Sequence, residues 1–454
     1  MLHKNKRVLA VSMLVISILL AACGDNTATA PAPTTAAAVA ATTAAATTAA
    51  ATTAAVATTA AATTAAATTA AATTAAATTA AATTAAVTTA AATTAAVTTA
   101  AATTATTAAA VSAVLPTGFD AAKGCKNVGL LLPETDSSAR WEQFDRPLLE
   151  AAIKLAIPGV TVQYANANNN ADTQQNQAEA ALTKGACILV VGAKDADKAS
   201  AIVQKAKAAK VPVIAYDRLI QDNDLAFYVS FDNVKVGEIQ GQYIVDNHKK
   251  GDKVSMINGS KTDNNALLFY QGAMNKLKPL FDSGELVKVY DQFTPDWNNA
   301  TAQSEMEAAL TGAKNDIQIA YVANDGMANS VIAALKAQKL NGKVLVTGQD
   351  ATVAGVQNII TGDQAMSVYK AIPQEVDLTA KLVAAFYNGT APVGLNGMTK
   401  TSTGKDIPSA LAVPVALDKT NILTTVVKDN FVTKADVCKG LTGITGDLFK
   451  TICS

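Results

Sequence analysis

Hydrophobic positions follow three different patterns along this 454-residue chain. Residues 8–20 form an unbroken apolar run near the amino terminus. Residues 26–114 repeat pairs of Thr with runs of Ala, and Val is the largest apolar side chain among them. After Lys126, short apolar runs alternate with amphipathic segments. This last pattern predicts buried strands that alternate with helices.

The alternation occurs twice, which predicts two α/β halves. In the first half we expect strands at residues 128–132, 160–166, 187–193, 211–216 and 227–231. In the second half we expect them at residues 254–259, 286–293, 317–325, 343–350 and 365–370. Strands that alternate with helices favour a doubly wound parallel sheet. Two such halves predict two Rossmann-like lobes with a cleft between them, and one large Rossmann-like domain is the alternative.

The stretch of residues 211–233 connects the two halves. Its first apolar run ends at the charged pair Asp217 and Arg218, and open α/β sheets bind their ligands at the carboxyl ends of strands. The next apolar run follows too soon for a crossover helix. It closes on Asp232 and Asn233, where a new helical pattern begins. We interpret the stretch as strand, ligand-contacting loop, strand and exit into the second lobe.

Residues 1–22 have the pattern of an export signal. Lys4, Lys6 and Arg7 precede the apolar run, which is too short to span a bilayer comfortably. Leu-Ala-Ala then precedes Cys23, an arrangement that resembles a lipobox, whose cysteine receives a diacylglycerol. We therefore expect Cys23 to be lipidated and to anchor the mature protein on the outer face of the cytoplasmic membrane. An ordinary signal peptide with an incidental cysteine is the alternative.

The Thr/Ala tract predicts a disordered stalk over residues 23–123. Its five-residue repeat fits neither a heptad nor a single helical face, and it offers too little apolar area to build a core. Such a stalk would hold the folded lobes away from the lipid surface. Whether its threonines carry O-linked sugars stays open.

Composition and motifs argue against several classes of protein. The formal net charge is zero, which does not suit a nucleic-acid partner. Two histidines, His3 and His248, offer almost nothing to histidine-based catalysis or to a metal site, so we expect no metal and no cofactor. No GxGxxG or GxxxxGK[ST] motif follows any expected strand, which counts against dinucleotide-binding and P-loop enzymes.

Polar and aromatic residues recur at the ends of the expected strands in both halves. Carboxylates, amides and cationic groups suit sugar hydroxyls, which both donate and accept hydrogen bonds, and flat aromatic rings suit the apolar faces of a pyranose. Each residue alone has a structural explanation, such as a local ion pair for Asp217 and Arg218. Their recurrence along one sheet edge predicts a site in the cleft. The candidate ligand-binding residues are Arg140, Trp141, Asp217, Arg218, Asn264, Asn265, Trp297, Asn324, Asp350 and Lys370.

These motifs resemble those of the extracytoplasmic sugar-binding proteins of ABC importers. The matching segments, in order, are VGLLLPETDSSARW, VIAYDRLIQ, FYVSFDNVKVGE, DNNALLFYQGAM, VANDGMA, TGQDATVAG and VYKAI. The resemblance is strongest to the members that bind D-xylose, and it implies that the candidate residues contact the sugar. After Trp141 this chain reads Glu142-Gln143-Phe144-Asp145, whereas the xylose-binding pattern has a Lys-Asp pair there. This departure leaves the fine sugar preference open.

The resemblance implies a type I periplasmic-binding fold, with two lobes joined by three crossings of the chain. We expect a first lobe from residues 124–232 and 371–405, a second lobe from residues 233–370 and 406–431, and a tail from residues 432–454. It also implies a monosaccharide ligand, D-xylose before others, and an ABC permease in the membrane as partner. We expect a monomer outside the cytoplasm that is not an enzyme.

Three rival functions use similar scaffolds. A glycosidase needs two carboxylates around the scissile bond; Asp217 and Asp350 are available, but nearby cations would keep them ionised. A ligand-binding transcription regulator needs a basic helix-turn-helix before the first strand, where this chain has an export signal and a stalk. A binding protein that reports a bound sugar to a signalling receptor remains an open alternative.

Four cysteines follow the stalk, and an exported location permits disulfides. Cys438 and Cys453 lie in a short tail with little apolar area, where a disulfide would contribute roughly 3 kcal/mol in the chain-entropy model. Cys125 precedes the first expected strand and Cys187 opens the third, and these strands are neighbours in a sheet ordered 2-1-3-4. Of the three possible pairings, we predict Cys438–Cys453 and Cys125–Cys187.

Overall fold

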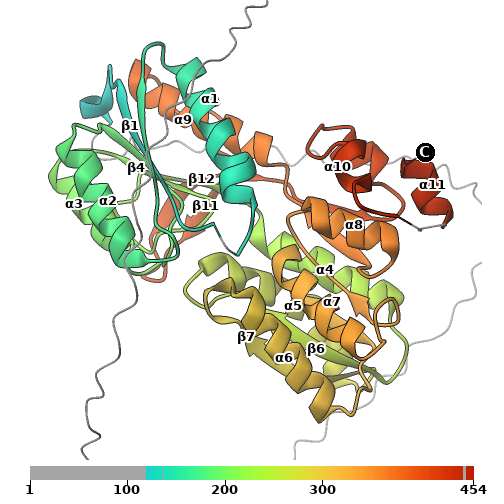
Figure 1. Cartoon of the computed structure of the whole chain (residues 1–454). Coiled ribbons are helices and arrows are strands. Elements are labelled where there is room, and N and C mark those ends of the chain that lie inside the picture. Colours follow the sequence, from blue (N-terminus) through green and yellow to red (C-terminus); the bar gives the residue numbers. More distant parts are fainter. Residues whose placement is uncertain (1–118, 136, 443–445, 454) are drawn as a thin grey trace, which may run out of the picture. The chain divides into compact units, whose positions relative to one another are not determined.

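The computed structural model describes residues 119–135, 137–442 and 446–453 (Figure 1). The expected signal peptide, Cys23 and nearly all of the expected stalk lie outside the described residues. The stalk boundary at residue 123 was placed too late, because Phe119 and Ala122 are buried. The ring of Phe119 packs against that of Phe386 at 5.1 Å between centroids, so Phe119 already belongs to the folded first lobe.

The first lobe is built on a seven-stranded sheet in the order β11-β12-β5-β4-β3-β1-β2. Its strands are parallel except for β11, and β1 lies between β2 and β3 as expected. The elements of this lobe are η1 (Asp120–Ala122), β1 (Asn127–Leu132), η2 (Trp141–Asp145), α1 (Arg146–Ala156), β2 (Thr161–Asn166), α2 (Ala171–Thr183), β3 (Ile188–Val191), α3 (Ser200–Ala208), β4 (Val213–Tyr216), β5 (Phe227–Phe231), α9 (Ile372–Asn388), β11 (Gly397–Lys400) and β12 (Asp406–Ala412).

Helices cover both faces of this sheet (Figure 1). Leu149 of α1 and Phe386 of α9 are buried on one face, together with Leu130 of β1. Ala178 of α2 is buried on the other face, with Leu131 of the same strand. Successive strand residues point to opposite faces, so a continuous apolar run such as that of β1 serves two layers of helices. The expected doubly wound arrangement is therefore confirmed.

The second lobe has a four-stranded parallel sheet in the order β7-β6-β8-β9 and a short antiparallel pair, β10 with β13. Its elements are α4 (Asn233–Asn247), β6 (Asp252–Asn258), α5 (Asn264–Asp282), β7 (Leu286–Phe293), η3 (Pro295–Trp297), α6 (Asn299–Gly312), β8 (Ile319–Val322), α7 (Asp325–Ala337), β9 (Leu345–Val346), α8 (Val353–Thr361), β10 (Met366–Tyr369) and β13 (Val415–Asp418). After it come η4 (Leu423–Val427), α10 (Lys434–Cys438) and α11 (Asp447–Cys453).

The strand expected at residues 343–350 is much shorter than predicted. Only Leu345 and Val346 pair with β8, and the chain then turns through Asp350 and Ala351, whose φ angles are 94° and 51°. Non-glycine residues seldom adopt a positive φ. The apolar run marked a buried segment correctly, but its carboxyl end is a turn that presents Asp350 to the cleft.

The chain crosses between the lobes three times, as expected. The first crossing follows β5 and the second lies between β10 and α9. The third was placed at residue 405, and that boundary is wrong. Strand β12 pairs with β5 in the first-lobe sheet, for example Ser409 opposite Tyr228, so the chain returns to the second lobe after Ala412. Residues 406–412 read equally well as a strand of either sheet, and sequence alone does not choose between them.

Helices α4 and α5 approach each other backbone to backbone. A Cβ atom at Gly237 would lie 1.9 Å from the carbonyl oxygen of Phe269, and one at Gly272 would lie 2.0 Å from that of Val234. Any side chain at either position would force the helices apart. The two glycines therefore fix the packing of α4, which starts at the first crossing, on α5, which starts at the cleft.

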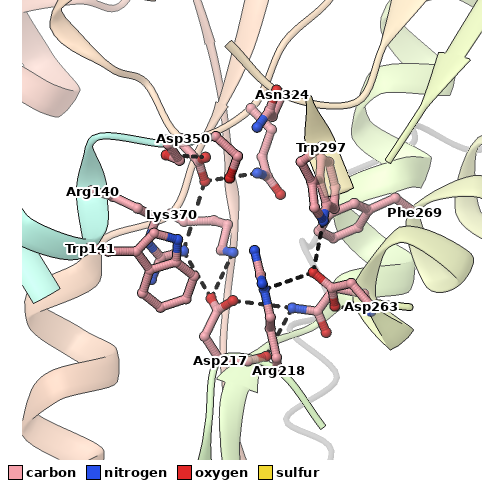
Figure 2. A pocket seen from close by; sticks show the side chains of 14 residues that line it. Arg140, Trp141, Asp217, Arg218, Asp263, Phe269, Trp297, Asn324, Asp350 and Lys370 are labelled. Atoms are coloured by element: carbon pink, nitrogen blue, oxygen red, sulfur yellow. Dashed lines mark hydrogen bonds and ion pairs between the residues drawn. The ribbon is translucent and has the colours of Figure 1, made fainter. Parts of the chain in front are cut away.

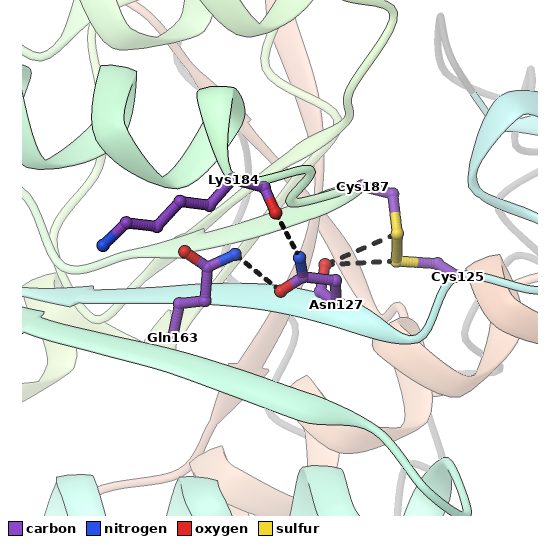
Figure 3. The surroundings of a disulfide bond; sticks show 5 residues. All are labelled: Cys125, Asn127, Gln163, Lys184 and Cys187. Carbon is purple, nitrogen blue, oxygen red and sulfur yellow. Dashed lines mark hydrogen bonds between the residues drawn. A yellow bond between two sulfur atoms is a disulfide. The ribbon is translucent and has the colours of Figure 1, made fainter.

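Both predicted disulfides are present. Cys125 and Cys187 join the start of β1 to the start of β3, with 5.7 Å between their Cα atoms. Figure 3 shows Asn127 beside this bond: its side-chain amide donates to the carbonyl of Lys184 at 2.8 Å and accepts from Gln163 at 2.6 Å. The second disulfide joins Cys438 to Cys453, with 5.6 Å between Cα atoms.

The segment after β13 covers α8 and one crossing. Gln357 of α8 donates to the carbonyl oxygens of Asp436 and Lys439. Phe431 is buried, and its ring stacks on Phe144 at 4.6 Å and lies 5.0 Å from Tyr369. Within the described residues, no helix is both long and apolar enough to cross a membrane.

Candidate ligand-binding site

A cavity lies where the loops at the carboxyl ends of strands from both lobes meet (Figure 2). Most of its lining side chains are polar or aromatic. They are Ser137, Ser138, Arg140, Trp141, Asp217, Arg218, Asp263, Asn265, Phe269, Trp297, Asn324, Gln349, Asp350 and Lys370. Residues more than 200 positions apart in the sequence, such as Ser138 and Asp350, are in hydrogen-bond contact here, at 3.3 Å. The predicted convergence of strand ends on one site is therefore confirmed.

One of the ten candidate residues does not line the cavity. Asn264 is half-buried, and its side-chain oxygen accepts from the amide of Gln221 at 3.0 Å. Its neighbour Asn265 faces the cavity instead. Adjacent residues at the start of a helix point about 100° apart, so the start of α5 directs one asparagine inward and the other to the edge.

Five lining residues are not among the ten candidates, namely Ser137, Ser138, Asp263, Phe269 and Gln349. Asp263 and Gln349 belong to the polar groups that follow the expected strands, so the pattern includes them, but only their neighbours were chosen as candidates. Phe269 lies one turn into α5 and looks like a core position in the sequence. For the two serines, the polar loop before Arg140 gave the only signal.

Arg140 holds the first-lobe side of the cavity together. It lies just before η2, and its guanidinium donates to both carboxylate oxygens of Asp145, at 2.9 and 2.7 Å. It also donates to Asp217 at 2.9 Å and to Glu375 at 3.1 Å, and its distance to Asp350 is 3.8 Å. One cation therefore serves carboxylates from both lobes.

The groups behind Arg140 are fully buried. Asp145 and Glu375 are each 0 % exposed, and the hydroxyl of Tyr216 donates to Asp145 at 2.5 Å. Burial, together with the charge of Asp217, raises the pKa of Glu375 well above its usual value. This shift favours the protonated form of Glu375 and so opposes the ion pair with Arg140.

Asp217 lies at the centre of the cavity wall, immediately after β4. Its φ of 60° turns the chain sharply at the strand end. Its carboxylate accepts from Arg140 and from Lys370, each at 2.9 Å, and from Asn265 at 3.2 Å. Burial acts to raise the pKa of Asp217, but the charges of Arg140 and Lys370 outweigh it and lower that pKa below its usual range. Asp217 is therefore an ionised acceptor with a fixed orientation.

Trp141 lies between two guanidinium groups. The ring centroid is 4.8 Å from the guanidinium carbon of Arg140 and 5.1 Å from that of Arg218, within the range of cation–π attraction. Arg218 in turn bonds Glu134 at 2.5 Å and Asp263 at 2.9 Å. The ring is held by these contacts and by burial, since it is 2 % exposed.

On the second-lobe side, several polar groups are also helix caps. Asn324 accepts from the backbone amide of Met327 at the start of α7, at 2.9 Å. Asp263 caps α5 in the same way and accepts from the indole nitrogen of Trp297 at 3.2 Å. Capping satisfies backbone amides that lack partners within the helix, so these side chains have fixed positions.

Trp297 fits its place because residue 259 is a glycine. A Cβ atom there would lie 2.1 Å from the indole ring. The ring meets that of Phe269 edge-on, with 6.3 Å between centroids. The cavity thus has Trp141 from the first lobe and an aromatic pair from the second, and these rings line it together with the charged groups (Figure 2).

Two buried polar atoms of lining residues have no hydrogen-bond partner among the described residues. One is the indole nitrogen of Trp141, a donor, and the other is the side-chain oxygen of Gln349, an acceptor. Buried polar atoms are nearly always hydrogen-bonded. An unpaired donor and an unpaired acceptor in one cavity are therefore suited to a ligand that both donates and accepts.

The charges of the lining residues are matched in number. Arg140, Arg218 and Lys370 are cationic, and Asp217, Asp263 and Asp350 carry carboxyl groups. Burial raises the pKa of Asp263 and Asp350 above the usual value, although neighbouring cations oppose the shift. A polar ligand without net charge suits such a cavity. Within the described residues, no group of His, Cys, Asp and Glu is arranged to hold a metal ion.

Comparison with known proteins gives consistent results. A model of the periplasmic binding protein domain matches residues 128–391. The D-xylose-binding periplasmic protein of Escherichia coli is 40% identical over 293 residues, which is 64% of this chain and 87% of that protein. The multiple sugar-binding periplasmic receptor ChvE of Rhizobium radiobacter is 35% identical over 350 residues, which is 72% of this chain and 96% of that protein.

A solved structure shows the same arrangement. It is a carbohydrate transporter solute-binding protein from Chloroflexus aurantiacus in complex with D-glucose. Its sequence is 31% identical, its TM-score is 0.63, and the match covers 68% of this chain and 97% of that one.

Proposed function

Because this chain belongs to the periplasmic binding protein family, we propose that it captures D-xylose or a similar aldose in the cavity between its lobes. At the coarser level, its relatives are periplasmic sugar-binding proteins, so the chain is a sugar-binding component of an ABC importer and not an enzyme. The single observation that carries the choice of ligand is the lining of the cavity: equal numbers of cationic and carboxyl groups beside Trp141 and Trp297.

The lining supports an uncharged monosaccharide for three physical reasons. Charged side chains make strong hydrogen bonds to neutral hydroxyls, and here they are already paired with one another, so no ligand charge is needed. The aromatic rings suit the apolar face of a pyranose. The unpaired atoms of Trp141 and Gln349 supply one donor and one acceptor, which a hydroxyl satisfies together.

The proposed preference for D-xylose rests on similarity. Two relatives named for binding D-xylose are 40% and 39% identical to this chain. Other relatives are named for multiple sugars, and the solved structure described above holds D-glucose. The residues after Trp141 also depart from the xylose-binding pattern. We therefore place D-xylose first and expect related aldoses to bind more weakly.

In this proposal the closed, sugar-loaded protein is the form that an ABC permease receives. The expected lipid on Cys23 would keep the protein at the outer face of the cytoplasmic membrane, and the Thr/Ala stalk would give it reach. We expect the protein to act as a monomer. A sensory role is the second candidate, since one relative is named a receptor; deleting the gene would then abolish a sugar response and leave uptake intact.

Isothermal titration against a panel of aldopentoses and aldohexoses tests the ligand. We expect one binding site per chain and the tightest binding for D-xylose, accompanied by a change in tryptophan fluorescence as Trp141 and Trp297 lose water. A variant that keeps the fold but lacks the central carboxylate, Asp217→Asn, is the control. If no aldose in the panel releases heat or changes fluorescence, the proposal is wrong.

A further inference from the structure

Outside the cavity, a separate set of contacts joins the two lobes. Lys194 of the first lobe pairs with Asp296 of the second at 2.7 Å. The backbone amide of Ala196 donates to the carbonyl of Thr262 at 2.9 Å. The third contact is the hydrogen bond from Gln221 to Asn264 described above. We call these three interactions the rim contacts. Their first-lobe residues follow β3 and β4, and their second-lobe residues follow β6 and β7.

The backbone of Lys194 is anchored within the first lobe, and its side chain is buried where it meets Asp296. Its side chain is 6 % exposed, and lysine is rarely buried unless it is paired. Its backbone amide donates to the side chain of Gln174 at 2.9 Å, and Gln174 donates in turn to the carbonyl of Gly192 at 2.8 Å. Gln174 is 1 % exposed. The first lobe thus fixes the backbone from which this side chain reaches Asp296.

Asp296 is equally constrained in the second lobe. It has φ 56° and ψ 18° within η3, a left-handed conformation that Asp and Asn tolerate better than most residues. Its backbone amide donates to the hydroxyl of Ser260 at 3.2 Å. The next residue is Trp297, which lines the cavity. The pair of Lys194 and Asp296 therefore fixes the loop that carries a cavity aromatic.

None of the six residues in the rim contacts lines the cavity. From this separation we propose that the rim contacts, above all Lys194 with Asp296, stabilise the closed arrangement of the lobes by the same amount whichever sugar is bound. These residues then act as positioning residues: they set the affinity for all ligands together, and the lining residues set the choice among ligands. The proposal builds on the proposed sugar-binding function.

The lobes are in equilibrium between an open and a closed arrangement. A sugar held only in the closed arrangement binds with its intrinsic affinity multiplied by the fraction of sugar-free molecules that are closed. A contact present only in the closed form raises that fraction, and its contribution cancels when two sugars are compared. Asp296 is 53% exposed, so water and salt weaken the pair. We therefore expect a moderate effect on affinity that shrinks as salt concentration rises.

The test uses Lys194→Met, which keeps the apolar stem, and Asp296→Asn, which keeps the backbone preference. Each is expected to weaken the binding of every sugar that the protein accepts by about three- to tenfold, mainly through faster release. The double variant should match the single ones, because both remove the same interaction. Lys194→Arg should restore most of the affinity. Lys198→Met is the matched control, since Lys198 lies in the same loop with a side chain 57% exposed and 3.9 Å from first-lobe Asp172.

A second readout needs no sugar. Spin labels on exposed helix positions, at Lys154→Cys in the first lobe and Lys278→Cys in the second, report the distance between lobes. Without sugar, Lys194→Met should shift the distance distribution towards longer values, and Lys198→Met should not. The distance between the lobes can be measured even if no tested sugar binds. The role of the rim contacts can therefore be tested apart from the proposed sugar-binding function.

Two results would overturn the proposal. Unchanged affinity and unchanged distances in Lys194→Met and Asp296→Asn would show that the pair contributes nothing to closure. A loss of affinity for one sugar that spares another would mean that these residues act through the ligand.

Discussion

The two lobes supply the cavity with polar groups that are held in different ways. In the first lobe, ion pairs hold the polar groups in place: Arg140 contacts Asp145, Asp217 and Glu375 within 3.1 Å. In the second lobe, Asn324 and Asp263 are held by the starts of α7 and α5, which they cap. Removing a partner from the first arrangement leaves a buried charge unpaired, which is far more costly than losing a cap.

One buried carboxylate from each lobe shows the difference most clearly. Asp217 is surrounded by Arg140, Lys370 and Arg218, which lower its pKa despite burial. Asp325, at the start of α7, accepts from Thr352, Gln364 and Ser367. Burial raises the pKa of Asp325 to about 7, and the charge of Asp350 adds to the shift. The cations around Asp217 outweigh the effect of burial on its pKa, whereas the neutral donors around Asp325 do not.

The largest expected effect comes from removing the shared cation. Arg140→Met should abolish measurable sugar binding and lower the free energy of unfolding by about 3–5 kcal/mol, because several buried carboxylates lose their counter-charge. Urea unfolding and calorimetric titration measure the two effects. Arg146→Met is the control, since that side chain is 43% exposed and contacts Glu142 and Glu150. Normal binding by Arg140→Met would show that the charge network is not needed for the site.

The second prediction concerns pH and the second lobe. Asp325 has a folded pKa of about 7, above its unfolded value of 3.8. Its protonated form therefore stabilises the fold fully below about pH 4, and this contribution is lost as pH rises through about 7. Between pH 4 and 8 we expect a loss of about 2–4 kcal/mol in the free energy of unfolding.

Asp325→Asn carries a permanent donor in place of the acid proton and should flatten this part of the pH profile. Urea unfolding at intervals from pH 4 to pH 8 compares the two proteins. Identical slopes in the variant and the unsubstituted protein would assign the pH dependence to another group.

A third and smaller effect is expected for the central carboxylate of the first lobe. Asp217→Ala should weaken sugar binding by roughly ten- to a hundredfold, since it leaves a buried sugar hydroxyl without its partner at about 1–3 kcal/mol. Titration calorimetry at neutral pH is the measurement. An unchanged dissociation constant would remove Asp217 from the site.

The smallest expected effect distinguishes two neighbouring asparagines. Asn265 donates to the carbonyl and the carboxylate of Asp217, so Asn265→Ala should weaken binding by about tenfold. Asn264 contacts only the rim residue Gln221 in its described hydrogen bonds, so Asn264→Ala should weaken binding by about twofold at most. The same titration decides between them, and a larger effect at Asn264 would reverse our assignment.

The sequence predicted most of this site, for a reason that lies in the fold. Parallel strands present their carboxyl ends along one edge, so polar residues at strand ends converge wherever the chain forms such sheets. The order 2-1-3-4 of a doubly wound sheet makes β1 and β3 neighbours, and the pairing of Cys125 with Cys187 follows from it. The positions of the strand ends do not tell which way each side chain at the start of the next helix points. For that reason Asn264 was chosen along with Asn265.

The buried residues that contact Arg140 from behind the cavity lining were not predictable from strand ends. Glu375 lies in the first turn of α9, where an acidic residue looks like an exposed group that favours the helix dipole. In the structure it is fully buried against Arg140, 235 positions away in the sequence. The predicted boundary of the third crossing was wrong for a related reason: residues 406–412 join the first-lobe sheet through pairing with β5, a contact between segments far apart in the sequence.

The close packing of α4 on α5 has a mechanical consequence. Asn233 opens α4 at the first crossing, and its side chain donates to Asn265 at the start of α5 at 2.9 Å. At Gly237 and Gly272 the two backbones meet with no side chain between them, so the helices have little room to shift against each other. A small rotation of the backbone at Asp232 therefore moves α4 and α5 as one rigid unit, and with them the part of the cavity wall at the start of α5.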